Sequence, residues 1–243
     1  MFSLRYSRES ALPMIGIAGL EKIMNSRISV IGVGATGSAA LDLFARNGAR
    51  EIRIADPDTV DISNLHRQSL YSESDIGTHK VEAAKRRISQ INSKILVSAF
   101  PVRADSSNIT EITDGVSIII DGTDNMASRK LINDFSIKTG IPWVFSSAIG
   151  STGQVKIIIP GKTACLGCLG VDYSSPDVRC EDTGVLASAP YIVGNLAWTL
   201  AVRYILGSEL EDSIYSIDVL NMDIAKVRTV MNPQCYSCGS VFK

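Results

Sequence analysis

Short apolar runs alternate with longer amphipathic segments along the first part of the chain. The runs predict strands at 27–32, 51–56, 96–102, 116–121 and 142–146, and helical periodicity predicts helices at about 37–47, 78–92 and 126–139. Apolar runs of this length are typical of strands that helices cover on both faces. The repeated strand–helix units predict an α/β fold with a Rossmann-like, doubly wound, mainly parallel sheet.

The pattern changes after about residue 150. Further strands are expected at 153–159, 214–219 and 226–231 as antiparallel additions to the sheet, and the long apolar stretch 191–206 predicts a helix. Asn195, Thr199 and Arg203 are spaced four apart, which gives this helix one polar stripe. A core helix with one wet edge fits this pattern better than a membrane span does.

The chain has neither an internal repeat nor a low-complexity linker, so we expect one domain over residues 1–243. Its expected parts are an N-terminal arm (1–25), a nucleotide-binding part (26–150) and a second part (151–243) that contains an irregular loop at about 169–188. A loop of this length in a compact domain usually has a function.

Composition narrows the classes of partner. Hydrophobic residues make up 45% of the chain, charged residues make up 20%, and the net charge is -1. Because there is no basic block, we expect no nucleic-acid partner, and because there is no apolar span, we expect no membrane. Residues 1–8 contain arginines but no apolar signal-peptide core, which favours a cytoplasmic location.

A glycine-rich turn follows the first expected strand. Residues 32–37 read G-V-G-A-T-G and lie between a strand and a helix, where glycines let the backbone approach a phosphate at the helix N-terminus. Asp56 ends the next strand, where it can accept from a ribose hydroxyl. An NAD-dependent oxidoreductase has the same two features, so this motif alone leaves the nucleotide open.

A polar block further along the chain distinguishes a dinucleotide site from a triphosphate site. It reads D-x-D-x-V-x-x-S-N-L-x-R-Q from Asp56 to Gln68, and G-x-x-K follows from Gly77 to Lys80. A dinucleotide has little need for these Asn, Arg and Lys side chains, whereas a triphosphate must have its charge neutralised for pyrophosphate to leave. The alternative for Arg67 and Lys80 is that each is a solvated surface charge.

Together with Arg5-Tyr6-Ser7-Arg8 and D-G-T-D-N at residues 121–125, this block resembles the motifs of the MoeB/ThiF family, the relatives of ubiquitin-activating enzymes. The resemblance runs from about Arg5 to Gly239. It implies an ATP-dependent adenylyltransferase that activates the C-terminal glycine carboxylate of a ubiquitin-like sulfur-carrier protein ending in Gly-Gly and releases pyrophosphate. It also implies a homodimer in which Arg8 enters the neighbouring subunit's site, with residues 151–243 binding the carrier.

The resemblance also implies roles for single residues. Asp56 would hold the ribose, Arg67 and Lys80 the phosphates, and Asp124 the Mg²⁺ beside the reacting carboxylate. Ala35 stands where the family commonly has glycine. The residues expected around ATP are Gly32, Gly34, Ala35, Gly37, Asp56, Asp58, Ser63, Asn64, Arg67, Gln68, Lys80, Asp124 and Asn125.

Four of the five cysteines form two C-x-x-C pairs, Cys165/Cys168 and Cys235/Cys238. Four thiolates make the closed shell of a structural Zn²⁺ site, and the alternatives are redox-active pairs or unligated thiols. The fifth is Cys180. By resemblance it can become covalently linked to the carrier during sulfur transfer, and the alternative is a surface thiol that catalysis does not need.

Other functions remain open at this stage. They are an NAD-dependent oxidoreductase, a non-catalytic scaffold like the inactive halves of heterodimeric activating enzymes, and an enzyme that adenylates a tRNA base or a peptide. Retention of Arg8, Arg67, Lys80 and Asp124 argues against a scaffold. No rhodanese-like segment follows Lys243, so we expect a separate sulfur donor.

Overall fold

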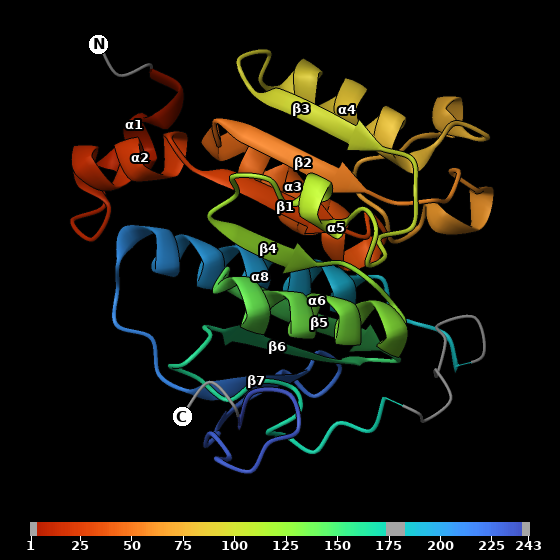
Figure 1. Cartoon of the computed structure of the whole chain (residues 1–243). Helices are drawn as coiled ribbons and strands as arrows, with labels where there is room; N and C mark the ends of the chain where they lie inside the picture. Colours follow the sequence, from red (N-terminus) through yellow and green to blue (C-terminus); the bar gives the residue numbers. More distant parts are fainter. Residues whose placement is uncertain (1–3, 174–182, 240–243) are drawn as a thin grey trace.

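An eight-stranded mixed sheet forms the centre of the computed structural model, which describes residues 4–173 and 183–239 (Figure 1). The strand order is β3-β2-β1-β4-β5-β6-β7-β8. The parallel strands are β1 (Arg27–Ile31), β2 (Glu51–Ala55), β3 (Leu96–Phe100), β4 (Ile118–Asp121) and β5 (Trp143–Ile149). The antiparallel continuation is β6 (Thr152–Ile158), β7 (Ser213–Asp218) and β8 (Asp223–Arg228). The predicted fold class is confirmed.

Helices cover both faces of the sheet, as a doubly wound fold requires. One face packs against α3 (Ala35–Asn47), α4 (Lys80–Ile91) and α8 (Ser188–Leu206), and the other against α5 (Ile109–Ile112) and α6 (Met126–Thr139). Gly194 lets α8 approach α3 closely, because a Cβ at this position would lie 2.4 Å from the Thr36 carbonyl oxygen. On α8 the side chains of Asn195 and Thr199 are exposed, as the polar stripe predicts.

Two parts of the sequence-based prediction differ from the structure. The last strand begins at Asp223 and ends at Arg228, earlier than predicted, because the hairpin turn at Met222 lets Asp223 pair with Asp218. The N-terminal arm also contains the elements η1 (Leu4–Tyr6), α1 (Ser7–Ser10) and α2 (Gly16–Met24), which the periodicity did not predict. Among the described residues, none of the helices combines the length and apolar character needed to cross a bilayer.

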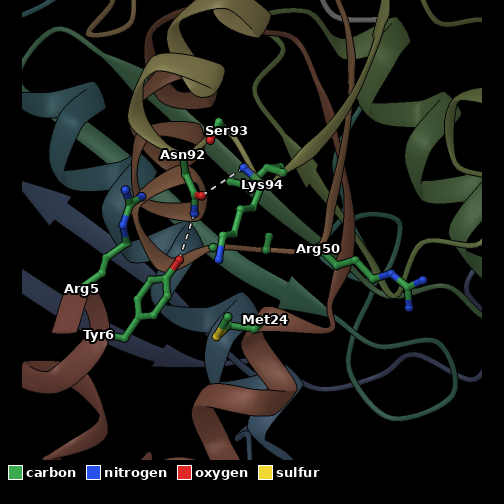
Figure 2. Close-up of a pocket in the computed structure, with 10 residues that line it drawn as sticks. Arg5, Tyr6, Met24, Arg50, Asn92, Ser93 and Lys94 are labelled. Carbon is green, nitrogen blue, oxygen red and sulfur yellow. Dashed lines mark hydrogen bonds between the residues drawn. The ribbon is translucent and has the colours of Figure 1, made fainter. Parts of the chain in front are cut away.

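The arm is anchored at the edge of the sheet where β2 and β3 begin. Figure 2 shows the pocket of about 470 Å³ at this place, in which the Asn92 side chain donates to the Tyr6 hydroxyl at 2.9 Å. Arg5 donates to the Ile91 carbonyl at the end of α4, where a cation suits the helix dipole. Gly48 lies against the Tyr6 hydroxyl, since a Cβ there would be 2.2 Å away. The arm therefore lies at the amino edge of the parallel strands.

Candidate active site

A cleft of about 990 Å³ lies at the opposite edge, where the parallel strands β1, β2 and β4 end. This is where ligands bind in open α/β sheets. Every residue predicted to surround ATP lines the cleft except Gly37. The structure thus brings together motifs that are as far apart in sequence as residues 32 and 125.

The glycine turn is packed against the turn after β4. Gly32 has a φ of 86°, and a Cβ there would lie 2.6 Å from the Gly122 carbonyl. A Cβ at Gly37 would lie 2.1 Å from the Gly32 carbonyl oxygen, so Gly37 is needed for packing behind the cleft. Helix α3 begins at Ala35, and its first N–H groups have no partner within the helix. They offer a phosphate both hydrogen bonds and the positive end of the helix dipole.

Asp56 is held rigidly beside this turn. Its Oδ2 accepts from the Val33 N–H at 2.8 Å and its Oδ1 accepts from the Asp58 N–H at 2.9 Å. Burial raises the pKa of Asp56, while the positive charge of Lys80 acts in the opposite direction. An ordered carboxylate at the end of β2 suits a ribose hydroxyl.

Two cations, Lys80 and Arg67, line the cleft and make few hydrogen bonds to the rest of the protein. The Lys80 ammonium, whose side chain is 8% exposed, donates to Asp58 Oδ2 at 2.8 Å, and the Asp58 side chain is 59% exposed. Because the carboxylate of this ion pair is largely solvated, it does not need the ammonium, and a phosphate can take the ammonium over. Arg67 donates to the Ser63 carbonyl at 2.7 Å, which leaves most of its donors available.

Ser63 and Asn64, which were expected to surround ATP, form hydrogen bonds with Asp61. The Ser63 hydroxyl donates to Asp61 Oδ1 at 2.6 Å, and Asn64 Oδ1 accepts from the Asp61 N–H at 3.2 Å. Asp61 and Asn64 thus form a capping box for η2 (Ile62–Asn64), and Ser63 supports it through its hydrogen bond to Asp61. Gln68, by contrast, has a buried Oε1 without a hydrogen-bond partner among the described residues. Such an atom is available to a donor on a bound ligand.

The loop after β4 carries Asp124 into the cleft. Its side chain is exposed, and its Oδ1 accepts a long hydrogen bond of 3.4 Å from Asn125 Nδ2. Asn125 caps helix α6, since its Oδ1 accepts from the Ser128 N–H at 2.9 Å. An exposed carboxylate beside a phosphate site provides the hard oxygen ligand that Mg²⁺ prefers.

Two cleft residues were missed by sequence reasoning. Arg103 follows β3 and is exposed, and its guanidinium has no protein partner among the described residues. Arg129 lies one turn into α6 and pairs with the fully buried Asp121. Burial raises the pKa of Asp121, and the positive charge of Arg129 acts against this rise. The position of Arg103 after a parallel strand was the available signal, while nothing in the local pattern distinguished Arg129 from a surface cation.

One predicted catalytic residue, Arg8, lies outside the cleft of its own chain. It is exposed on α1 (Ser7–Ser10), at the amino edge of the sheet. Cys180 lies outside the described residues, so its role stays a prediction.

The four paired cysteines come together beside the antiparallel strands. Their sulfur atoms all lie within 4.8 Å of one another, and Cys165 Sγ is 3.8, 3.6 and 3.5 Å from those of Cys168, Cys235 and Cys238. A tetrahedral ion with bonds of about 2.3 Å separates its sulfurs by roughly 3.8 Å, so the cluster fits Zn²⁺. Gly167 closes the turn, since a Cβ there would be 2.9 Å from Cys235 Sγ.

The pKa values of these thiols show why a cation is needed to keep all four ionised. Burial raises the pKa of Cys165 to about 11 and raises that of Cys238 further. Burial also acts to raise the pKa of Cys235, but hydrogen bonds from the Cys238 and Ser237 N–H groups outweigh it and lower the value. Thiolates crowded in this way need a cation to stay ionised together.

Comparison with known proteins identifies the family. The model of the ThiF family matches residues 6–237, so this chain belongs to the ThiF family. The chain is 35% identical to the sulfur carrier protein ThiS adenylyltransferase of Bacillus subtilis, over 97% of this chain and 71% of the relative. It is 32% identical to the sulfur carrier protein adenylyltransferase of Thermus thermophilus, over 97% and 90%. The predicted enzyme class, an adenylyltransferase, is confirmed.

Solved structures share the fold. The crystal structure of E. coli MccB with ATP superposes with a TM-score of 0.82 at 22% identity, covering 98% of this chain and 75% of MccB. At this identity the likeness establishes the fold alone.

Proposed function

We propose that this protein uses ATP to adenylylate the C-terminal glycine carboxylate of a small ubiquitin-like sulfur-carrier protein that ends in Gly-Gly, for sulfur transfer or protein conjugation. One observation carries the proposal. A helix N-terminus, two lightly held cations (Arg67 and Lys80) and the exposed carboxylate of Asp124 share one cleft, in a chain whose ThiF-family relatives are named for sulfur carriers.

The reaction forms a bond between a carboxylate oxygen and the ATP α-phosphorus and breaks the bond from that phosphorus to the β-phosphate oxygen, so pyrophosphate leaves. No general base is required, because the attacking carboxylate is already ionised. This agrees with the positions of His66 and His79, neither of which lines the cleft. The residues contribute by positioning the two reactants and neutralising charge.

Each cleft residue has a part in this scheme. Asp56 accepts from the ribose, and the N-terminus of α3 binds phosphate oxygens. Lys80 leaves Asp58 for the phosphates and acts with Arg67. Asp124 holds Mg²⁺, which when bound neutralises phosphate charge.

The carrier is proposed to dock on the edge strand β8. All residues of β8 are exposed, and three exposed apolar residues lie near its start: Leu220 and Met222 in the turn before it, and Ile224 on the strand, with Met222 85% exposed. Because Thr152 pairs with Asp218 and β6 begins just after β5 ends, the β7–β8 turn lies at the same edge of the sheet as the cleft. A carrier at this position can extend its C-terminal tail into the cleft.

Homodimerisation with Arg8 acting in trans is part of the proposal. Arg8 belongs to the amino edge and the cleft to the carboxyl edge, so it cannot serve the cleft of its own chain. The arm also exposes the apolar side chains of Leu4, Leu12, Met14 and Ile17, which a second copy could cover. The metal in the cysteine cluster is proposed to be structural Zn²⁺, which supplies folding energy without an open coordination position.

The test is carrier-stimulated exchange of labelled pyrophosphate into ATP. Exchange should require a carrier that ends in Gly-Gly, and a carrier lacking these glycines should give none. Met222→Asp should raise the KM for the carrier while leaving the Kd for ATP unchanged. Leu96→Asp, which changes an exposed apolar residue at the far edge of the sheet, is the matched control. Exchange driven by a peptide or a tRNA, or binding of NAD(H) in place of ATP, would replace this function with the corresponding alternative.

A further inference from the structure

A buried ion pair lies directly behind the loop that carries Asp124. Arg129 Nε is 3.4 Å from Asp121 Oδ2, with side-chain exposures of 8% for the arginine and 0% for the aspartate. Burying two charges is costly, and the pair stabilises the protein only if further hydrogen bonds satisfy both partners. These further bonds show what the pair holds in place.

Both partners hold Thr123, the residue before Asp124. Asp121 Oδ1 accepts from the Thr123 N–H at 2.9 Å and from the Thr123 hydroxyl at 2.6 Å. From the other side, Arg129 Nη2 donates to the Thr123 carbonyl at 3.0 Å and to the Ser146 carbonyl on β5 at 3.3 Å. The N–H, the hydroxyl and the carbonyl of Thr123 are all fixed by this pair.

The loop that the pair holds also packs against the glycine turn. Gly122 lies between Asp121 and Thr123, and a Cβ there would be 2.1 Å from the Gly32 carbonyl oxygen. The Arg129 guanidinium in turn lies 5.2 Å from the centre of the Phe145 ring. The loop is therefore enclosed by the phosphate-binding turn in front and by β5 behind.

We propose that Asp121 and Arg129 are positioning residues that hold the Asp124 carboxylate at a fixed distance from the phosphate-binding turn. Asp124 is exposed and has few contacts of its own, so its place is set by the backbone on which it stands. The inference rests on the proposed function, in which Asp124 holds the metal bound with ATP. Arg129 acts through Thr123.

The conservative variant Arg129→Lys tests this role. Lysine keeps a positive charge beside Asp121 but lacks the planar fork that reaches three acceptors at once. We expect the exchange rate to fall about 10- to 100-fold, since a displacement near 1 Å can have this effect. The Kd for ATP without a divalent ion should change less than about threefold, because Arg67, Lys80 and the glycine turn are untouched.

A double-mutant cycle with Asp124→Ala separates positioning from general stability. If Arg129 acts through Asp124, Arg129→Lys adds little to the loss already caused by Asp124→Ala. A merely structural role predicts that the two losses multiply, and that result would overturn the proposal. Lys130→Met is the control, because this neighbouring lysine forms an exposed ion pair with Asp134 on the same helix and should leave exchange unchanged.

A binding measurement keeps this inference separate from the proposed function. The affinity for Mn²⁺, measured by its electron paramagnetic resonance signal with a non-hydrolysable ATP analogue, requires no carrier. Arg129→Lys should weaken Mn²⁺ binding by the same factor as Asp124→Ala, and unchanged binding would refute the inference.

If the wild-type protein shows no carrier-stimulated exchange, the proposed function fails while this measurement still decides the role of Arg129. Should Arg129→Lys not fold, the near-isosteric Asp121→Asn is measured instead, and failure of both to fold would leave a purely structural pair.

Discussion

The cleft and the cysteine cluster arrange their polar groups in opposite ways. In the cleft, Lys80 is paired with a largely solvated carboxylate, Asp124 is exposed, and the Gln68 amide oxygen lacks a partner among the described residues. In the cluster, Cys165 and Cys235 are buried and their sulfurs contact each other at 3.6 Å. The polar groups of the cleft remain available to a bound nucleotide, whereas the four sulfurs of the cluster lie within 4.8 Å of one another and are proposed to hold a structural metal ion.

The cysteine cluster and the cleft also differ in how tightly the protein packs around them. The cluster belongs to the apolar core on the α6 face, together with Trp143, Phe145 and Leu166. The cleft lies over the ends of strands, and its groups can be changed without opening a core. We therefore expect changes in the cluster to alter stability, and changes in the cleft to alter catalysis at constant stability.

The largest effect is expected in the cluster. Cys235→Ser removes one metal ligand, and structural zinc sites contribute on the order of 10 kcal/mol of binding free energy. We expect loss of bound zinc, measured by atomic absorption, and a strong decrease in the free energy of unfolding, measured with urea. A chelator should reproduce the change in the wild-type protein. Unchanged stability without zinc would show that the cluster does not hold the fold together.

The next effect belongs to the cleft. Lys80→Ala should lower the pyrophosphate-exchange rate by about 10²-fold, the size of loss typical for a group that stabilises developing charge. The unfolding midpoint should hardly move, because Asp58 is solvated when it loses its partner. Lys85→Ala, an exposed lysine on the same helix, is the control. A large loss of stability in Lys80→Ala would remove the distinction between the two regions.

Much of this distinction follows from the sequence. Alternating apolar runs predicted the parallel strands, because strands buried on both faces must be apolar throughout. The two C-x-x-C pairs predicted the cluster, since each pair is local and sulfur ligands are specific. The cleft was predicted because the residues that follow parallel strands meet at one edge of the sheet.

What the sequence did not predict depends on side-chain contacts that no motif specifies. Arg129 looks like a surface cation until the fold places Asp121 behind it. Asn64 forms its capping box with Asp61, a residue that the nucleotide motif does not require, and the Ser63 hydroxyl bonds to the same carboxylate. The arm helices are short and take their position from Tyr6, which binds a residue 86 positions away in the sequence.

A mixing experiment tests whether the cleft is complete within one chain. Arg8→Ala should lower the exchange rate by roughly 10-fold or more if Arg8 neutralises phosphate charge, and Lys80→Ala should lower it by about 10²-fold. In a heterodimer of the two, the Arg8→Ala subunit keeps its own Lys80 and receives Arg8 from its partner. After the two proteins are unfolded and refolded together, about a quarter of the wild-type exchange should return, since half of the dimers contain one complete site. No recovery would contradict action in trans.

The smallest effect concerns the pH dependence of Asp56. Its raised pKa means that the carboxylate protonates at a higher pH than an ordinary aspartate, so affinity for the ribose should begin to fall at a correspondingly higher pH as the solution is acidified. Adenosine is the suitable ligand because it has no phosphate to titrate, and calorimetry should show a loss of a few-fold. The ligand-free protein should behave in the opposite way, because ionising a carboxyl group with a raised pKa costs stability as the pH rises through this window.

Lys80 sharpens this last prediction, because its charge opposes the rise in the pKa of Asp56. In Lys80→Ala the loss of adenosine affinity should therefore begin at a higher pH than in the wild-type protein. Asp56→Asn, which cannot titrate, should bind adenosine weakly and with little dependence on pH. If all three proteins show the same pH profile, Asp56 does not contact the ribose, and other groups in the cleft must bind adenosine.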